Sequence, residues 1–204
     1  MSKSPRSSGA AGQIRIIGGQ WRGRKLPVPD SAGLRPTTDR VRETLFNWLA
    51  PDIQEARCLD CFAGSGALGL EALSRYAASA TLLEMERSVA QQLSQNLQTL
   101  RSTQGNVVQT NTLQWLSQPG EPFDVVFVDP PFRKGLLLET LTLLENNGWL
   151  AENALIYVES EVEHGTPVAP ANWDLYREKI AGQVAYRLYQ RQQDQRQQET
   201  HDVA

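Results

Sequence analysis

The residues best suited to chemistry begin with a glycine-rich stretch that follows a short apolar run. Residues 58–75 read Cys-Leu-Asp-Cys-Phe-Ala-Gly-Ser-Gly-Ala-Leu-Gly-Leu-Glu-Ala-Leu-Ser-Arg, which predicts a strand, a tight turn and a helix. Gly64 and Gly66 have no Cβ atom, so the backbone there can turn sharply and approach a ligand closely. Backbone amides at the start of the helix are expected to face that ligand unpaired. The turn that begins at Phe62 and Ala63 is therefore a candidate cradle for an adenosine-containing cofactor.

Gly64, Gly66 and Gly69 form a Gly-x-Gly-x-x-Gly pattern, which suits a dinucleotide as well as any other adenosine-containing cofactor. Two carboxylates distinguish between these cofactors. Asp60 lies near the carboxyl end of the apolar run, where it would repel a pyrophosphate but favour a cationic or hydroxyl-rich ligand. This favours S-adenosylmethionine over a nicotinamide dinucleotide. Glu84 comes twenty positions after Gly64, where a Rossmann-type strand presents an acid to ribose hydroxyls. Glu86 is the alternative for that role, although a position at the start of a helix suffices to explain it.

A second motif ends a later apolar run, where residues 124–132 read Asp-Val-Val-Phe-Val-Asp-Pro-Pro-Phe. Residues 58–66 resemble the first motif of Rossmann-like methyltransferases. The Asp-Pro-Pro-Phe sequence resembles the motif of enzymes that methylate planar exocyclic or amide nitrogens. In such chemistry the Asp129 carboxylate and the Pro130 carbonyl accept hydrogen bonds from the target amino group and aim its lone pair at the sulfonium methyl group. Phe132 can stack on a base lifted out of its surroundings.

The sequence Asn111-Thr112 lies between these motifs, at the end of an apolar run over residues 106–110. In similar methyltransferases the residues that contact adenine fall at this point, so the resemblance implies a cofactor contact. The simpler role is a cap for a helix over residues 113–116. The two roles are compatible.

Cys58 and Cys61 form a Cys-x-x-Cys pair, but the rest of the sequence argues against zinc and redox roles. Only His164 and His201 could complete a zinc site, and His201 lies in a Gln-rich tail that we expect to be disordered. A redox pair usually opens a helix, whereas a strand would point these thiols to opposite faces. We therefore expect buried cysteines, no metal site and the reducing environment of the cytoplasm.

The composition and the alternating apolar patterns predict one α/β domain. A chain of 204 residues, 40% hydrophobic and 21% charged, can bury a substantial core, and no apolar run is long enough to cross a bilayer. Five strand patterns alternate with helical ones, and a loop and an antiparallel hairpin over residues 173–191 follow. With the resemblance, this order implies a Rossmann-like class I methyltransferase fold, a seven-stranded, mostly parallel sheet with an antiparallel C-terminal hairpin. The expected divisions are a disordered tail (1–12), a basic hairpin and helix (13–50), the catalytic domain (51–191) and a disordered tail (192–204).

Positive charge is concentrated at the N-terminal end. Residues 1–42 contain nine Lys or Arg and two acidic residues, a net charge of +7, which leaves −10 for the remainder of a chain whose total is −3. Clustered cations make salt-sensitive contacts with phosphates, so this arm predicts a nucleic-acid partner. Two short strands are predicted here, joined at Gly18-Gly19, with Trp21 assigned to packing more readily than to base stacking. The expected RNA contacts are Arg15, Arg22, Arg24, Lys25 and Arg35; Arg133 and Lys134 either grip phosphates beside the target or face solvent at a helix start.

A helix is predicted over residues 39–49, with Thr38 as its N-cap and Pro51 beyond its end. With the residues before it, the stretch Arg-Pro-Thr-Thr-Asp-Arg-Val-Arg-Glu-Thr-Leu-Phe-Asn-Trp-Leu closely resembles the bacterial 16S ribosomal RNA guanine-N2 methyltransferases of the RsmD family. The resemblance runs over residues 14–191. It implies methylation of the exocyclic N2 of guanine 966 in 16S ribosomal RNA, within the small subunit or its assembly intermediate, by a monomer.

The residues alone leave other functions open. The same acceptor geometry would serve adenine N6 or a glutamine amide, and guanine is favoured only by the resemblance. The basic arm disfavours a protein substrate. A non-catalytic RNA-binding assembly factor could retain this fold, but the intact Asp60, Glu84 and Asp129 argue against loss of activity. A nicotinamide dehydrogenase is the third alternative, which calorimetry with the two cofactors would exclude.

Overall fold

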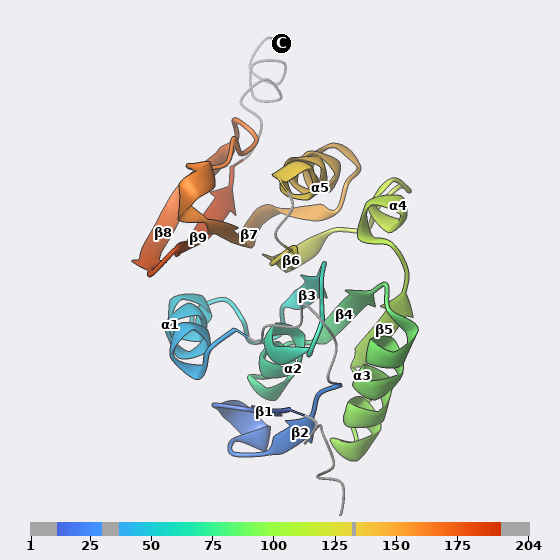
Figure 1. Cartoon of the computed structure of the whole chain (residues 1–204). Helices are drawn as coiled ribbons and strands as arrows, with labels where there is room; N and C mark the ends of the chain where they lie inside the picture. Colours follow the sequence, from blue (N-terminus) through green and yellow to red (C-terminus); the bar gives the residue numbers. More distant parts are fainter. Residues whose placement is uncertain (1–11, 30–36, 132–133, 193–204) are drawn as a thin grey trace, which may run out of the picture.

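A central sheet positions the rest of the protein (Figure 1). This computed structural model describes residues 12–29, 37–131 and 134–192, except for the side chain of Lys134. The strands of the sheet are β3 (Arg57–Asp60), β4 (Ser79–Glu84), β5 (Gly105–Gln109), β6 (Phe123–Val128), β7 (Leu150–Glu161), β8 (Trp173–Ala181) and β9 (Val184–Arg191). Their order is β5-β4-β3-β6-β7-β9-β8, parallel from β5 to β7 and antiparallel for β9 against both neighbours. The predicted sheet of seven strands, with its antiparallel C-terminal hairpin, is confirmed.

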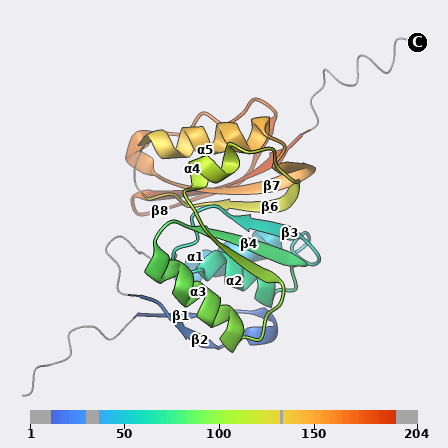
Figure 2. The same ribbon diagram turned by 90° about the vertical axis from the view of Figure 1, so that its right-hand side faces the viewer.

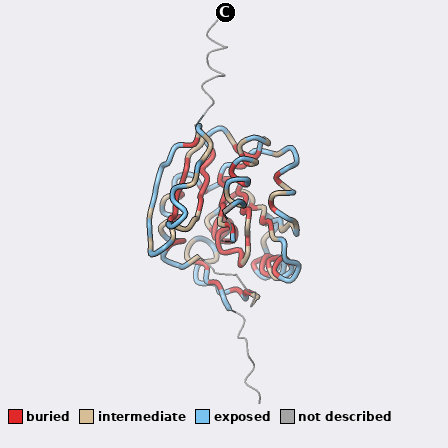
Figure 3. Tube along the Cα trace, turned by 45° about the horizontal axis from the view of Figure 1, so that its top comes forward, coloured by how far each residue is buried: buried red, intermediate tan, exposed pale blue. Residues whose placement is uncertain are grey.

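Helices cover both faces of this sheet (Figures 1 and 2). One face carries α1 (Asp39–Leu49), α2 (Ala67–Ser74) and α3 (Arg87–Thr99), and the other carries α4 (Thr112–Leu116) and α5 (Lys134–Asn146). Because successive strand residues point to opposite faces, two separate cores form. Figure 3 shows the buried residues gathered in the interior, with the exposed residues around them. Cys58 belongs to one core and Cys61 to the other, and burial raises the pKa of both thiols. No helix within the described ranges is long and apolar enough to cross a membrane.

Helix α1 begins and ends where the sequence predicts. The Thr38 hydroxyl oxygen accepts a hydrogen bond from the Val41 amide at 3.3 Å and caps the first turn. One side chain of the helix departs from expectation, because Arg42 is only 2% exposed. It donates to the backbone carbonyl of Arg15 at 2.8 Å and to the Asp39 carboxylate at 2.6 Å. Arg42 therefore connects α1 to the N-terminal hairpin and does not belong to the solvent-facing basic residues.

The N-terminal hairpin consists of β1 (Gln13–Arg15) and β2 (Lys25–Pro27), paired antiparallel as predicted. Its connection is longer than the predicted turn at Gly18-Gly19 and contains a 3-10 helix at Gly19–Trp21. The reason is a tertiary contact: Gly19 has a φ of 80°, and a Cβ atom there would lie 1.9 Å from the Ser74 carbonyl oxygen of α2. Trp21 is half-buried against the core, which is the packing role.

Helix α2 holds this hairpin through two buried side chains. The Glu71 carboxylate accepts hydrogen bonds from the Ile17 amide at 3.1 Å and the Gly18 amide at 3.3 Å. The Ser74 hydroxyl donates to the Gly18 carbonyl at 2.6 Å and accepts from the Trp21 amide at 3.0 Å. The hairpin thus forms a fourth layer beneath α2 and α3, visible at the bottom of Figure 2, and its apolar residues join the same core as the helices.

The C-terminal third follows the predicted order. β7 starts at Leu150, which pairs with Phe123 before a register shift in the β6–β7 ladder. α5 runs from Lys134 to Asn146. Between β7 and β8 lies the predicted loop, which contains one short 3-10 helix (Val162–His164).

Candidate active site

The turn between β3 and α2 forms the predicted cradle. Gly64 and Gly66 both have positive φ angles, 53° and 82°, and a Cβ atom on Gly66 would lie 2.5 Å from the side chain of Leu93 in α3. The Ala63 amide donates to the Leu83 carbonyl of β4 at 2.9 Å, so the turn is held against the neighbouring strand. Phe62 is half-buried against the core on the α4 and α5 face. These contacts give the loop a defined shape without a side-chain cap on α2.

One expectation about this cradle is wrong, because two of the first amides of α2 are not left unpaired for a ligand. The Gly69 amide donates to Asp60 Oδ2 at 3.1 Å, and the Ala67 amide donates to the Ser65 hydroxyl oxygen at 3.3 Å. The side chains of the strand end and of the turn satisfy these donors internally. The helix start therefore positions Asp60.

Asp60 fits a cationic ligand. Its side chain is 2% exposed, and burial raises its pKa to about 7, an effect that the amides of Gly69 and Phe62 partly offset and the charge of Glu84 adds to. Its second oxygen, Oδ1, is buried and has no hydrogen-bond partner among the described residues. An unpaired buried carboxylate oxygen is costly, and a ligand carrying positive charge would relieve that cost. S-adenosylmethionine carries a sulfonium and an ammonium group, so the residues present fit this cofactor.

We expect the affinity for S-adenosylmethionine to fall as the pH drops below about 7. The free protein keeps a proton on Asp60 up to that pH, whereas a cationic ligand favours the carboxylate, so Kd should rise by up to about tenfold per pH unit. Without ligand, the raised pKa of Asp60 makes the folded state bind more protons than the unfolded chain. The free energy of unfolding should therefore decrease as the pH rises from about 4 to about 7. Calorimetry across this range checks both trends. Asp60→Asn should flatten them, and an unchanged pH dependence in that variant would assign them to another group.

Glu84 closes the cradle from the end of β4. Its Oε2 atom accepts from the Gly64 amide at 2.9 Å and its Oε1 atom accepts from the Glu86 amide at 3.0 Å. Each carboxylate oxygen has a further lone pair, so the group can still accept from ribose hydroxyls while it holds the turn. Glu86 is exposed at the N-cap position of α3. We therefore keep Glu84 as the proposed ribose ligand.

Replacing Glu84 with alanine should weaken S-adenosylmethionine binding by about 2 kcal/mol, roughly thirtyfold in Kd. The variant loses a charged hydrogen-bond acceptor and the contact that holds Gly64. RNA affinity should change little, because Glu84 lies on the cofactor side. Isothermal titration of the variant beside Glu86→Ala provides the comparison. If Glu86→Ala has the larger effect, the ribose contact belongs to Glu86.

Asn111 and Thr112 take structural roles at the end of β5. The Asn111 side chain accepts from the Gln114 amide at 3.2 Å and caps α4, while the residue itself is exposed. Thr112 is buried, and its hydroxyl donates to the Cys61 carbonyl, which ties α4 to the cradle. The predicted helix cap is confirmed. A cofactor contact remains a proposal for Asn111 and for Thr112, whose hydroxyl donor is used by Cys61 but whose oxygen can still accept a hydrogen bond.

Asp129 follows β6 and meets residues that the sequence analysis did not assign to the site. The β6–β7 ladder pairs Val128 with Val158, which brings Asp129 beside Glu159. The two carboxyl groups share a hydrogen bond, and Thr37, just before α1, also hydrogen-bonds to Asp129. The Tyr157 hydroxyl donates to Glu159 Oε2 at 3.2 Å. Four side chains from three parts of the chain therefore converge at the carboxyl ends of β6 and β7.

The Asp129–Glu159 pair has unusual acid–base properties. Burial raises the pKa of both carboxyl groups, and the charge of Glu159 raises that of Asp129 further. Two close carboxyl groups cannot both ionise freely, so the pair holds one shared proton above the ordinary carboxyl range. The sequence contained a signal for this pair, since both acids end apolar strand patterns and parallel strands bring such ends to one edge.

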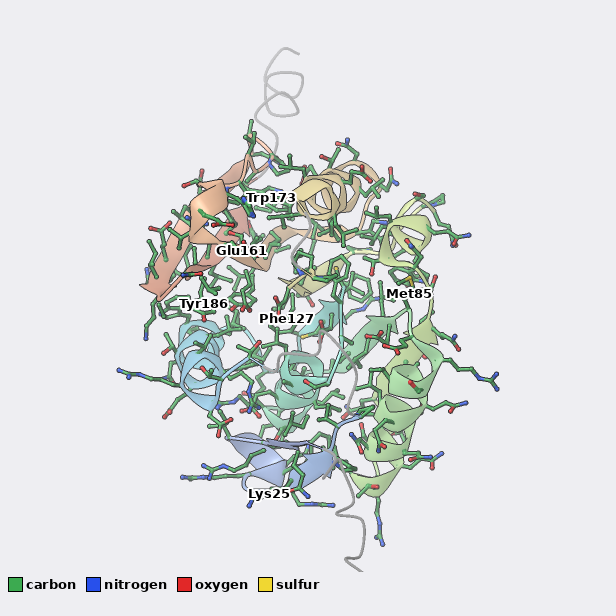
Figure 4. The ribbon with its side chains drawn as sticks, in the orientation of Figure 1. Lys25, Met85, Phe127, Glu161, Trp173 and Tyr186 are labelled. Atoms are coloured by element: carbon green, nitrogen blue, oxygen red, sulfur yellow. The ribbon has the colours of Figure 1, made fainter. Side chains whose placement is uncertain are left out.

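A cavity of about 270 Å³ lies next to this pair. Its lining includes Pro130 and Pro131 of the motif, Glu159 of β7, and Leu137 of α5. Phe132, Arg133 and Arg35, and the side chain of Lys134, lie outside the described residues. The four other predicted RNA-contacting residues, Arg15, Arg22, Arg24 and Lys25, are all exposed on the hairpin, where Figure 4 labels Lys25 at the far side from Trp173.

Among the described residues one group has ligand atoms close enough to hold a metal ion: Glu161, Glu163 and His164, at the end of β7 and in the 3-10 helix that follows. The three residues are half-buried or exposed, and both glutamates lie within 3.6 Å of the His164 ring. The group lies apart from the cysteines for which the sequence analysis weighed a zinc site.

Comparison with known proteins agrees with this geometry. A family model described as "Conserved hypothetical protein 95" matches residues 14–190. Ribosomal RNA small subunit methyltransferase D of Escherichia coli K12 is 73% identical over 190 residues, 93% of this chain and 96% of its own length. Its namesake from Haemophilus influenzae is 55% identical over 192 residues, 92% of this chain and 99% of its own length.

A solved structure described as a putative methyltransferase, yhhF, from Escherichia coli is 72% identical and covers 90% of this chain and 100% of its own, with a TM-score of 0.86. A putative methylase from Haemophilus influenzae is 52% identical, covers 89% of this chain and 100% of its own, and has a TM-score of 0.79. The match thus extends over the hairpin, the cradle and the Asp-Pro-Pro edge together. The chain belongs to the ribosomal RNA small subunit methyltransferase D family and is an S-adenosylmethionine-dependent methyltransferase.

Proposed function

We propose that this protein transfers a methyl group from S-adenosylmethionine to the exocyclic N2 of guanine 966 in 16S ribosomal RNA. One observation carries the proposal: the Asp129-Pro130 acceptor pair directly follows β6, the strand next to β3, which ends in Asp60. The β3–β6 ladder pairs Asp60 with Phe127, so a cationic cofactor at Asp60 and an amino group at Asp129 meet at the same sheet edge. High identity to small-subunit ribosomal RNA methyltransferases over nearly the whole chain supports the choice of substrate.

The chemistry assigned to the chain is mainly positioning. The lone pair of guanine N2 is delocalised into the ring, so the nitrogen is a poor nucleophile until its geometry changes. The Asp129 carboxylate and the Pro130 carbonyl accept hydrogen bonds from the two N–H groups of N2 and draw the nitrogen towards a tetrahedral arrangement. S-adenosylmethionine supplies a methyl group on a positively charged sulfur, which makes sulfur a good leaving group.

The bond balance follows from these roles. The nitrogen–carbon bond forms as the carbon–sulfur bond breaks, the sulfur leaves with the bonding electrons, and the methylated nitrogen then releases one proton. That nitrogen is acidic once formed, so no strong base is needed, and an ionised carboxylate of the Asp129–Glu159 pair can take the proton. Phe132 is proposed to stack on the target base.

The exposed cations of the hairpin are proposed to hold RNA phosphates. Arg15, Arg22, Arg24 and Lys25 lie on the solvent side of the fourth layer, while the apolar residues between them enter the core. This alternation presents the charges on one face. Arg35, Arg133 and Lys134 are proposed to extend the contact towards the target base. We also propose that the enzyme acts as a monomer, in the cytoplasm and without a metal.

The preferred substrate is expected to be the protein-bound small subunit, with faster transfer than to naked 16S RNA. The hairpin shares the core of the methyltransferase domain, so the described chain contains no independent RNA-binding module that could order a flexible target. Initial rates on deproteinised 16S RNA and on unmethylated subunits, at equal concentration and salt, test this. Equal or faster transfer to naked RNA would refute it.

Mapping the modified nucleotide separates guanine N2 from adenine N6, and the absence of any transfer would favour an assembly factor.

A further inference from the structure

We propose that Glu159 determines base specificity by accepting a hydrogen bond from the N1–H group of the target guanine, beside Asp129. The inference rests on the proposed function and specifies how that site distinguishes guanine from purines whose N1 is an acceptor. Glu159 is thereby given a role in substrate recognition, next to the catalytic role of Asp129 and Pro130.

The position of Glu159 supports this role. Parallel pairing of β6 and β7 places it next to Asp129, close enough for the two carboxyl groups to share a hydrogen bond. Glu159 also lines the cavity of about 270 Å³, together with Pro130 and Pro131. Three hydrogen-bond acceptors, the Pro130 carbonyl and the two carboxyl groups, are thus gathered at one edge of the sheet.

This set of acceptors complements guanine. The Watson–Crick edge of guanine presents N1–H and the N2 amino group side by side, so three N–H bonds can point at neighbouring acceptors. If Asp129 and the Pro130 carbonyl take the N2 hydrogens, the carboxyl group adjoining Asp129 is placed for N1–H. Adenine and 2-aminopurine present an unprotonated N1 there, and its lone pair would face a carboxylate.

Tyr157 holds Glu159 in place for this contact. Its hydroxyl donates to Glu159 Oε2, and its ring is fully buried between Phe127 and the surrounding core. One oxygen of Glu159 is thereby anchored, and its carboxyl group also shares a hydrogen bond with Asp129. In the free protein the two carboxyl groups share one proton, and with that proton retained each group still has an oxygen lone pair that can accept an N–H of guanine.

The test uses small subunits reconstituted with 16S RNA that carries either guanine or 2-aminopurine at the target position. Both bases have the N2 amino group, but only guanine has N1–H. The wild-type enzyme should prefer guanine in kcat/KM by about 10- to 100-fold, the discrimination expected when a charged acceptor is left facing a lone pair. Glu159→Gln should reduce this ratio towards one, because the amide can also donate to the N1 of 2-aminopurine. Glu163→Gln, a change at an exposed neighbouring residue, should leave the ratio unaltered.

The outcomes separate the inference from the proposed function. If Glu159→Gln lowers transfer to both bases equally and keeps the ratio, the residue only supports the fold or Asp129, and the inference is wrong. If wild-type enzyme treats both bases equally, the inference is again wrong while guanine-N2 methylation stands. If wild-type enzyme transfers no methyl group to guanine, the proposed function fails and the inference fails with it. Measured S-adenosylmethionine affinity of Glu159→Gln should match wild type.

Discussion

Asp129→Ala should reduce methyl transfer by about a thousandfold while binding S-adenosylmethionine nearly as well as the wild-type protein. The expected loss is that of removing one positioned group that acts mainly in the transition state. Asp129 follows β6 directly and contacts Glu159 and Thr37, whereas the cofactor cradle is built from β3, β4 and α2. Single-turnover transfer of a labelled methyl group and calorimetry with the cofactor measure the two quantities separately.

Asp124→Ala provides the matched control for this experiment. Asp124 lies near the start of the same strand, at its opposite end, where it accepts from the Arg57 amide at 2.8 Å. Its removal should leave methyl transfer close to normal. An equal loss of activity and cofactor affinity in Asp129→Ala would show that Asp129 belongs to the cofactor site.

Replacing Arg15, Arg22 and Arg24 together with alanine should weaken RNA binding by about a hundredfold at moderate salt. Each arginine that contacts a phosphate releases a counterion, so the slope of log K against log salt should become shallower by about 2 to 3. Cofactor affinity should be unchanged. Fluorescence anisotropy with an RNA fragment, measured at several salt concentrations, gives both the affinity and the slope.

The structure suggests a control for the loss of charge alone. Three other cations, Arg57 in β3 and Arg177 and Lys179 in β8, belong to the central sheet and not to the N-terminal hairpin. Their replacement with alanine removes the same number of charges. That variant should keep most of the salt slope. If the hairpin variant keeps its slope as well, the three arginines do not contact phosphates. A lower melting temperature would instead assign them to folding, with Arg24 the first to examine because it donates to the Thr99 carbonyl of α3 at 3.4 Å.

The basic arm also shows how residue type and structural role can differ. The sequence presents Arg42 as one more cation of a positively charged segment. In the structure Arg42 is buried, and it joins α1 to the hairpin through the Arg15 carbonyl. Burial depends on which surface α1 packs against, so a charge count along the chain could not distinguish it from the exposed hairpin arginines.

The sequence by itself determined the features that depend on near neighbours in the chain. Apolar periodicity located the strands and helices, because each element must bury one face or both. Thr38 was recognisable as a cap because its partner amide is three residues away. Gly64 and Gly66 predicted a tight turn, and the structure gives both residues positive φ angles, which glycine adopts without steric cost. Asp60, Glu84 and Asp129 were found because each ends an apolar run.

Only the tertiary structure shows which of these strand ends lie next to each other and which side chains make contact there. Asp129 and Glu159 are thirty residues apart, and they become partners because β6 and β7 are parallel neighbours in register. Thr37 hydrogen-bonds to Asp129 because α1, which it precedes, packs on one face of the sheet. Glu71 accepts a hydrogen bond from the Ile17 amide because α2 packs against the N-terminal hairpin. Such contacts depend on strand order and helix packing, which local residue patterns do not encode. The motif residues of the catalytic edge, Asp129 and Pro130, were therefore identified from the sequence, while the pairing with Glu159 that gives that edge its acid–base and recognition properties was not.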